Sequence, residues 1–258
     1  MRSIPKLSAF KAATCVAAVI IVGMARVASA ADSSWLDIEG QIQYAFYIED
    51  ARALVNLSEQ LSRTDAAPDP LRGYYAGLAH YRLSLLWATR EKERARDASE
   101  SCVASLEAAL EKQANFAEAL ALQSACLRAL VALKPWKTPL AGPKSTAQIE
   151  RAVQLAPKNP RVLLLQAIEG SAVDSTGAAK ADEQQLRRLH KVVAAFEIER
   201  QGLDKTPGWG AAEAYAYLGR TYLDKGDLVA ARDALERALL IAPDFVLARR
   251  LMSKVTVG

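Results

Sequence analysis

Hydrophobic residues recur along most of the chain at spacings of three and four positions. This spacing places them on one side of a helix, because an α-helix completes a turn in about 3.6 residues. Hydrophobic residues make up 51% of the 258 residues. They rarely alternate strictly with polar residues, as they would in a half-buried β-strand. The pattern therefore predicts an all-α protein that is built from amphipathic helices.

The helical runs come in pairs that are separated by polar or proline-containing stretches. The first pair is Trp35–Phe46 with Ile48–Leu61, and the segment 65–70, which holds two prolines, leads into the next pair. Proline lacks the amide hydrogen that a helix interior needs, so it favours helix boundaries. We expect pairs to start near residues 32, 72, 117, 160 and 212, followed by a final amphipathic helix over Phe245–Lys254.

The last pair carries the clearest motif. Counted from Ala212, its matching residues are Tyr215, Leu218, Gly219 and Tyr222 at positions 4, 7, 8 and 11, and Ala231, Leu235, Ala238 and Pro243 at positions 20, 24, 27 and 32. This spacing resembles that of the tetratricopeptide repeat (TPR) family, whose 34-residue unit is a pair of antiparallel helices. The resemblance implies a TPR-like α-solenoid of about five helical hairpins plus a C-terminal cap helix.

Two glycines explain part of this motif. Gly219 is small where we expect the two helices to approach closely, with Leu235 filling the space around it. Gly226 lies at the turn, where a residue without a β-carbon readily takes positive φ. Pro243 then ends the second helix, because it cannot lie in a helix interior.

The other units depart from the family pattern. Glu39 occupies a small-residue position of the first unit, and the intervals between unit starts (40, 45, 43 and 52 residues) all exceed 34. We therefore expect insertions in nearly every unit but the last. One of them, Lys134–Pro143, holds three prolines and is predicted to be non-helical.

Residues 1–30 have the features of a secretory signal peptide. A basic start precedes an apolar run from Ala12 to Ala25, and Ala28-Ser29-Ala30 supplies small residues for cleavage before Ala31. The alternative is an uncleaved anchor, but these 14 residues fall short of the roughly 20 that a membrane span needs. We expect a bacterial periplasmic protein with a mature domain over 31–258 and no integral membrane span in the mature chain.

The charge of the mature domain is balanced. Four of the 33 basic residues (Arg2, Lys6, Lys11 and Arg26) lie within residues 1–30, which contain no acid, so 29 basic and 29 acidic residues remain. A neutral domain gives no electrostatic reason to expect nucleic acid or an anionic membrane as a partner.

The sequence offers little for catalysis. The chain has two histidines, His80 and His190, which fall in different units, and it has no clustered cysteines. Neither a G-x-S-x-G motif nor a glycine-rich phosphate-binding motif is present. We therefore expect no enzyme, no metal site and no cofactor.

The TPR resemblance implies a binding surface on the concave side, where the first helix of each unit presents positions 2, 5, 9 and 12. The residues mapped to this surface are His80, Leu83, Arg128, Arg161, Leu164, Arg220 and Leu223. Arginines from three units can converge on a ligand carboxylate, which a guanidinium binds through two parallel hydrogen bonds. The alternative is that they are solvated or pair with Glu118 and Glu213. The Lys-Asn-Asn pattern of TPR domains that clamp chaperone C-termini is absent, since Ala216 and Arg220 occupy two of its positions.

Four aromatic residues are further candidates for partner anchors. They are Trp136, in the proline-rich insertion, and Tyr74, Tyr75 and Tyr81. Aromatic side chains at an edge often anchor a partner. We favour the alternative, in which they pack an irregular insertion onto its own repeat.

Two cysteines of the mature chain form a candidate disulfide. Cys102 and Cys126 each lie twelve residues from Ala114, near the predicted turn between the second and third units. Antiparallel helices that rise about 1.5 Å per residue bring both to the same height, and axes about 8–10 Å apart allow a bond. The alternative is two separate, small buried thiols.

Two functions fit this sequence. The first is an exported TPR scaffold that binds a protein or peptide through its concave groove and inserted loops. The second is a periplasmic small-molecule binding accessory of a transport system, in which long insertions close the groove into a pocket. An open groove with a polar rim favours the first function, and a closed apolar cavity favours the second.

Overall fold

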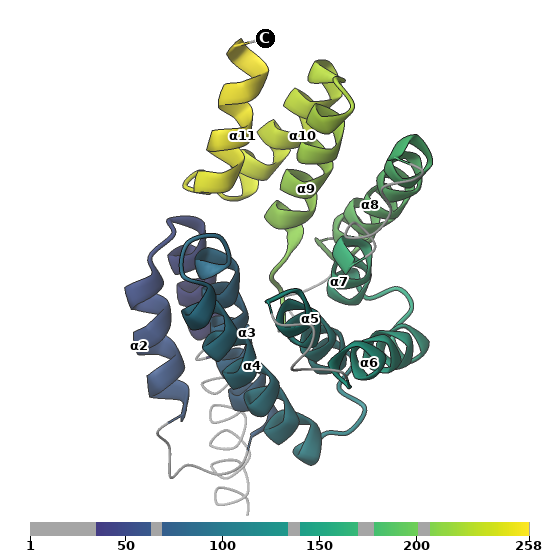
Figure 1. The fold of residues 1–258 in the computed structure, drawn as a ribbon. Helices are drawn as coiled ribbons and strands as arrows, with labels where there is room; N and C mark the ends of the chain where they lie inside the picture. Colours follow the sequence, from purple (N-terminus) through teal and green to yellow (C-terminus); the bar gives the residue numbers. More distant parts are fainter. Residues whose placement is uncertain (1–34, 63–68, 134–139, 170–177, 201–206, 258) are drawn as a thin grey trace, which may run out of the picture.

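The computed structural model describes residues 35–62, 69–133, 140–169, 178–200 and 207–257, and within these ranges every regular element is a helix (Figure 1). The helices are a first helix over residues 35–47, α2 (Ala51–Ser62), α3 (Pro70–Trp87), α4 (Lys92–Lys112), α5 (Ala117–Leu133), α6 (Ala141–Leu155), α7 (Pro160–Glu169), α8 (Ala178–Arg200), α9 (Ala211–Asp224), α10 (Leu228–Ile241) and α11 (Val246–Val257).

Consecutive helices pack as five hairpins. The first helix is followed by α2, and α3 packs on α4, α5 on α6, α7 on α8 and α9 on α10, while α11 follows as a cap. The hairpins start at residues 35, 70, 117, 160 and 211, close to the predicted positions. The predicted all-α solenoid of five hairpins and a C-terminal cap helix is therefore confirmed. The predicted signal peptide lies outside the described residues.

Helix ends follow from local chemistry. The carboxylate of Asp69 accepts a hydrogen bond from the amide of Leu71, and Pro70 begins α3, where no amide donor is needed. Gly226, at the turn between α9 and α10, has a φ of 78°, as predicted. The prediction for 134–143 was wrong in part: 134–139 lie outside the described residues, but α6 already includes Pro143. A proline in the first turn removes no intrahelical hydrogen bond.

Close helix contacts depend on glycine in two of the hairpins. A β-carbon built on Gly219 would lie 2.6 Å from Cγ of Leu235, which confirms the predicted close approach of α9 and α10. The second hairpin uses Gly77 in the same way, since its β-carbon would lie 2.7 Å from Cγ of Leu106. The sequence motif did not reveal this second contact, because Gly77 lies two residues before the position that the repeat register assigns to a small residue.

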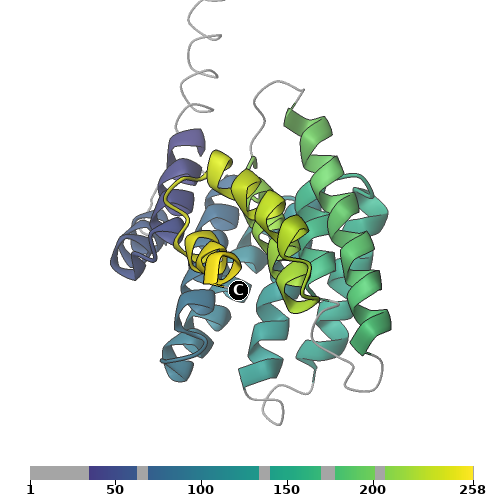
Figure 2. The same ribbon diagram turned by 90° about the horizontal axis from the view of Figure 1, so that it is seen from above.

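The last hairpin returns to the first helix, so the superhelix closes on itself (Figures 1 and 2). The rings of Tyr47 and Phe245 lie 4.6 Å apart between centroids, and that of Phe46 lies 6.1 Å from Phe245. Arg250 of α11 donates to both carboxylate oxygens of Glu49, at 3.0 and 3.1 Å. The two ends of the solenoid are thus in contact.

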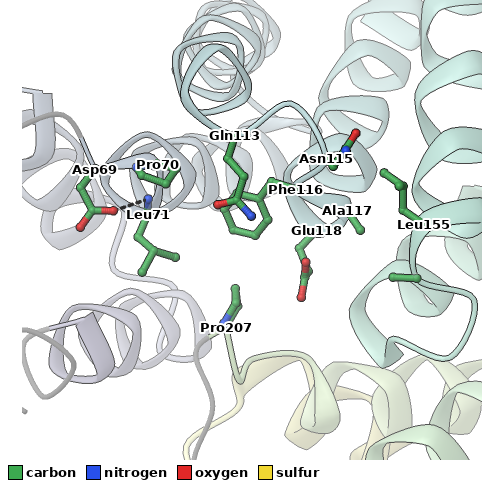
Figure 3. A pocket seen from close by; sticks show the side chains of 11 residues that line it. Asp69, Pro70, Leu71, Gln113, Asn115, Phe116, Ala117, Glu118, Leu155 and Pro207 are labelled. Atoms are coloured by element: carbon green, nitrogen blue, oxygen red, sulfur yellow. Dashed lines mark hydrogen bonds between the residues drawn. The ribbon is translucent and has the colours of Figure 1, made fainter. Parts of the chain in front are cut away.

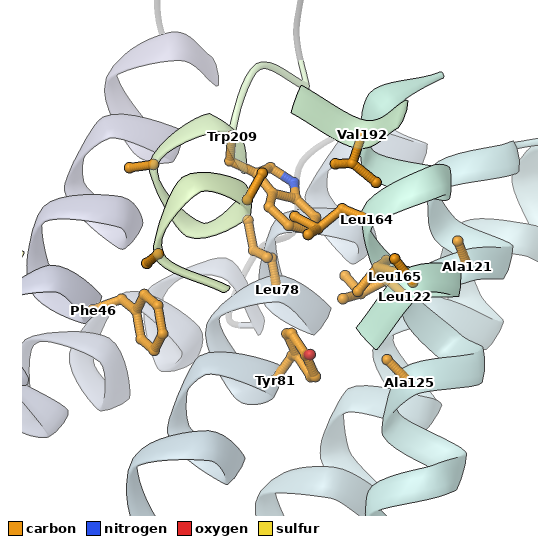
Figure 4. Packing of buried hydrophobic residues seen from close by; sticks show 14 of the residues in the cluster. Phe46, Leu78, Tyr81, Ala121, Leu122, Ala125, Leu164, Leu165, Val192 and Trp209 are labelled. Carbon is orange, nitrogen blue, oxygen red and sulfur yellow. The ribbon is translucent and has the colours of Figure 1, made fainter. Parts of the chain in front are cut away.

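This closure places α3 and α5 at the centre of the molecule. Both helices are buried on nearly all sides, which is typical of a helix in the core of a domain. Side chains from the first helix, α3, α5, α7, α8 and the segment before α9 meet there, among them Phe46, Leu78, Leu122, Leu164, Val192 and Trp209 (Figure 4).

A disulfide joins the second and third hairpins. It links Cys102 of α4 to Cys126 of α5, with Cα atoms 6.2 Å apart and both residues fully buried. The two helices run antiparallel from the turn between them, which brings the two cysteines to the same level.

Candidate partner-binding site

The segment Pro207–Gly210 lies where the TPR resemblance places a concave binding surface. It is not helical, and it runs between the first helices of three hairpins. The amide of Gly208 donates to both oxygens of Glu39, at 2.9 and 3.0 Å. The indole of Trp209 donates to the hydroxyl of Tyr74 at 2.7 Å, and its ring is 3% exposed. The chain therefore fills its own concave side.

A buried ion pair lies next to this segment. Arg82 of α3 and Glu213 of α9 are in contact, and each side chain is 3% exposed. Glu213 also accepts from the amide of Gln43 at 3.2 Å and from the hydroxyl of Tyr47 at 2.8 Å. The guanidinium of Arg82 lies 4.8 Å from the ring centre of Trp209. This network connects the first, second and fifth hairpins.

Arg161 does not face an open groove, so that part of the prediction was wrong. It is 2% exposed and forms an ion pair with Glu199 of α8, with a second contact at 3.0 Å. It also donates to the backbone carbonyl of Trp209 at 3.3 Å. Its guanidinium is thus already engaged by a carboxylate of this chain. The sequence argument failed because Pro207–Gly210 covers the surface on which Arg161 lies.

The two predicted groove leucines are buried as well. Leu83 is 2% exposed and Leu164 is 1% exposed, so both belong to the core. A β-carbon on Gly210 would lie 3.2 Å from Leu164, which shows how closely the segment before α9 packs on α7. Their assignment to an open concave surface is therefore wrong.

The remaining predicted residues are dispersed. His80 is half-buried, and burial lowers the pKa of its imidazole. Arg128 is half-buried, Arg220 is exposed and lies 4.0 Å from Asp224, and Leu223 packs against the core. Trp136 lies outside the described residues.

The three tyrosines neither form an exposed edge nor pack an insertion onto its own repeat, and Tyr74 and Tyr75 contact the neighbouring hairpins instead. Tyr74 and Tyr75 are fully buried and Tyr81 is 4% exposed, so none of them forms an exposed edge. They pack the molecule instead: Tyr75 stacks on Trp35, with ring centres 5.6 Å apart, and Tyr74 lies 4.9 Å from Phe116.

Burial perturbs the acid at the centre of this arrangement. It raises the pKa of the Glu39 carboxyl above its ordinary value, against the hydrogen bonds from Tyr75 and Gly208, which lower it. Burial also raises the pKa of the Tyr47 hydroxyl, and the charge of Glu213 adds to this effect. These groups hold the fold closed.

An open hollow lies beside the filled concave side, where the starts of α3 and α5 meet the ends of α4 and α6 (Figure 3). Its volume is about 510 Å³. Its lining residues are Asp69, Pro70, Leu71, Gln113, Asn115, Phe116, Ala117, Glu118, Leu155, Ala156 and Pro207.

The lining of this hollow combines apolar side chains with carboxylates. Phe116 is buried among its apolar walls, and Leu155 is 42% exposed. Asp69 and Glu118 supply its two carboxylates, and none of its described lining residues is a lysine, an arginine or a histidine (Figure 3). Each carboxylate accepts from a side chain of a neighbouring hairpin: Trp35 donates to Asp69 at 3.0 Å, and Asn159, just before α7, donates to Glu118 at 2.6 Å. Both keep lone pairs for a further donor.

Sequence reasoning missed every residue of this hollow. The signal was present in part, because Asp69 and Glu118 stand at the starts of two predicted units. From the sequence, Glu118 was interpreted only as a partner of the arginines and Asp69 was given no role, because their shared location depends on how neighbouring hairpins stack.

Two features bear on other kinds of site. Within the described ranges, no three His, Cys, Asp or Glu side chains are grouped so that they could hold a metal ion. No helix in the same ranges combines the length and apolar character of a membrane span.

Comparison with known proteins adds one distant likeness. No model of a protein family matches the chain, and no curated protein is similar to it. Among solved structures, residues 1–338 of Acl4, an assembly chaperone of RpL4, are similar with 15% identity and a TM-score of 0.36, covering 88% of this chain and 95% of that chain. A likeness at this score supports no conclusion about function, and the helical-repeat fold follows from the helices of this chain.

Proposed function

We propose that the protein is an exported helical-repeat scaffold that binds a protein or peptide partner in the periplasm. The observation that carries this proposal is the open hollow between α3, α4, α5 and α6, with its apolar floor and two carboxylates. The TPR-like register of the last hairpin supports an interaction role, since such repeats serve mainly as binding surfaces. The partner is held at the edge of the superhelix, because Trp209 occupies the concave side.

The chemistry of the hollow favours a segment with a basic side chain. Asp69 and Glu118 give it negative charge, and none of its described lining residues is basic, while the charge of Arg161 acts on Glu118 from outside the lining. The aliphatic stem of a lysine or arginine packs on apolar walls while its charged end reaches a carboxylate. Phe116 and Leu155 supply such walls.

The size of the hollow also supports a second function. Pockets for small molecules have volumes of about 300–1,000 Å³, and about 510 Å³ falls within this range. A small cationic solute would use the same carboxylates, as expected for a binding accessory of a transport system. The hollow is open, however, which favours a segment of a larger partner.

Export is the second part of the proposal and rests on the sequence of residues 1–30. The expected mature N-terminus is Ala31. Mass spectrometry of the protein from the periplasmic and membrane fractions tests it, and an intact Met1 in the membrane fraction contradicts it.

The binding role is tested by photo-crosslinking in the native host. A photoreactive amino acid replaces Gln113, on the rim of the hollow, or Arg232, an exposed residue of α10 that serves as the control position. Crosslinks to a defined partner peptide are expected from position 113 and absent from position 232. Equal crosslinking from both positions contradicts the proposal.

A matched pair of substitutions then tests the chemistry. Leu155→Lys introduces a positive charge into the hollow and should weaken binding of the partner at least tenfold. Leu240→Lys makes the same change at a residue that is 81% exposed on α10, and it should have no effect. Native mass spectrometry of the exported protein distinguishes the second function, because a bound small molecule would appear as a mass increment that Leu155→Lys removes.

A further inference from the structure

The first helix carries apolar side chains on two opposite sides. Ile42 and Phe46 point into the core, at 0% and 8% exposure. On the other side, Leu36 is 41% exposed, Tyr44 is 56% exposed and Ile48 is 37% exposed. The amide of Ile48 donates to the carbonyl of Tyr44 at 3.1 Å, so the helical spacing continues to this residue. These outer side chains are not part of the core that the described residues form.

A glycine completes the outer row. Leu36, Gly40, Tyr44 and Ile48 are each four residues apart, and residues at this spacing form a ridge along a helix surface. Among the described residues, a β-carbon built on Gly40 would meet no atom within 4 Å, whereas one on Gly219 would meet Leu235 at 2.6 Å. Packing within the chain therefore explains Gly219 but not Gly40. Glycine also weakens a helix interior compared with alanine.

The row is complementary to itself when two copies meet antiparallel. Its members are symmetric about residue 42, so Leu36 of one copy comes level with Ile48 of the other. Tyr44 comes level with Gly40 of the second copy, where the missing side chain leaves room for its ring. Two-fold interfaces have this property, because one patch must fit itself.

We propose that the outer row of the first helix, Leu36, Gly40, Tyr44 and Ile48, is a docking surface for a second copy of this chain. The two helices cross midway between Gly40 and Tyr44, and the tyrosine ring of each copy lies over Gly40 of the other. A heterologous partner would need no such pairing of a large residue with a glycine at symmetric positions.

The charges around the row are compatible with this contact. None of the four residues is charged. Asp37 is exposed near the start of the helix, and Arg250 holds Glu49 at the other end. An antiparallel pair brings Asp37 of one copy toward Glu49 and Arg250 of the other. The positive charge of Arg250 then offsets the repulsion between the two carboxylates. The opposed helix dipoles also favour the antiparallel arrangement.

The interface is small, so the dimer is transient. One short helix per copy buries less than the roughly 800 Å² per partner of a standard stable interface. Dissociation constants in the micromolar range are expected for such a contact. The hollow lies at the ends of α3, α4, α5 and α6, so this proposal is independent of the proposed function.

Sedimentation equilibrium of the purified chain, over concentrations from about 1 to 500 µM, tests the proposal. The unchanged protein should shift from monomer to dimer within this range. Gly40→Leu should weaken the dimer at least tenfold without lowering the melting temperature, because its side chain enters open space in one copy. Tyr44→Glu should weaken it as well. Val229→Glu is the matched control, since Val229 is 76% exposed on α10.

Disulfide trapping tests the register. Copies with Gly40→Cys are mixed with copies with Tyr44→Cys, and the mixed dimer should crosslink faster than copies with Val229→Cys. A chain that stays monomeric at every concentration overturns the proposal. A dimer that Gly40→Leu and Tyr44→Glu leave unchanged also overturns it.

Discussion

The backbone amide of Gly208 donates to both carboxylate oxygens of Glu39, at 2.9 and 3.0 Å, across 169 residues of sequence. Tyr75 donates to the same carboxylate at 2.7 Å. One side chain of the first hairpin therefore accepts from the second hairpin and from the segment that leads into the fifth. This contact explains why an acid stands where the TPR pattern has a small residue.

Replacement of this acid tests how much it contributes to closure. Glu39→Ala restores a small residue but leaves two donors without an acceptor, and each buried unsatisfied group costs about 1–3 kcal/mol. We expect the free energy of unfolding to fall by at least that much in urea titrations. Tyr75→Phe in the same background should recover part of the loss. Equal stability of Glu39→Ala and the unchanged protein would show that closure does not depend on this contact.

The raised pKa of Glu39 predicts a dependence of stability on pH. A glutamate in an unfolded chain titrates near about 4.3. Since burial raises the pKa in the folded state, the folded protein holds the proton more tightly, and stability falls as pH rises through the window above this value. The advantage of the unchanged protein over Glu39→Gln should thus shrink as the pH rises above the unfolded-state pKa of about 4.3. Urea unfolding of both proteins measures it, and a constant difference contradicts the assignment.

The buried pair of Arg82 and Glu213 gives a larger expected effect. Glu213→Gln leaves the guanidinium in a site that is 3% exposed without a charged partner, which destabilises proteins by about 3–5 kcal/mol. Replacement of both residues by apolar ones of similar size should cost much less. Thermal unfolding compares them, with Glu236→Gln on the exposed side of α10 as the control. If Glu213→Gln lowered the stability no more than Glu236→Gln, solvent would have to reach the pair.

The hairpins were predictable because each depends on local patterns. Helix periodicity and boundary prolines placed the starts near residues 32, 72, 117, 160 and 212, and the structure has them at 35, 70, 117, 160 and 211. Gly219 and Gly226 were assigned correctly, because the close helix contact of one and the positive φ of the other both arise within a single repeat. The prediction was wrong at Pro143, because a proline in the first turn of a helix cannot be told from a helix-breaking proline by sequence alone.

The interior of the superhelix was not predictable from any one repeat. Glu39 was recognised as a departure from the pattern, but its partner Gly208 lies in a connection with no motif. Arg161 occupies a position that is exposed in an open solenoid and buried in a closed one. The residues of the hollow come from the ends of α3, α5 and α6 and from the segments that flank the helices, so their common location depends on how the hairpins stack and not on spacing in the chain.

The contact between Gly219 and Leu235 predicts how the last hairpin responds to overpacking. Gly219→Leu forces a side chain into space that Leu235 fills, and such changes cost about 1–3 kcal/mol or more. Gly40→Ala adds a β-carbon that meets nothing, so it should stabilise the first helix by about 0.5–1 kcal/mol. Chemical denaturation of the two variants should therefore shift in opposite directions. A stabilised Gly219→Leu would contradict the observed packing.

The disulfide between Cys102 and Cys126 predicts that oxidation stabilises the second and third hairpins together. It encloses a loop between residues 24 apart in sequence, and closing a loop of this size restricts the unfolded chain by about 2–4 kcal/mol. Thiol titration of denatured, unreduced protein from the exported fraction should find no free thiol in the mature chain. Reduction should then lower the unfolding midpoint, and Cys102→Ala with Cys126→Ala should be insensitive to reductant. Two titratable thiols per mature chain would leave both cysteines as separate buried side chains, with stability independent of redox conditions.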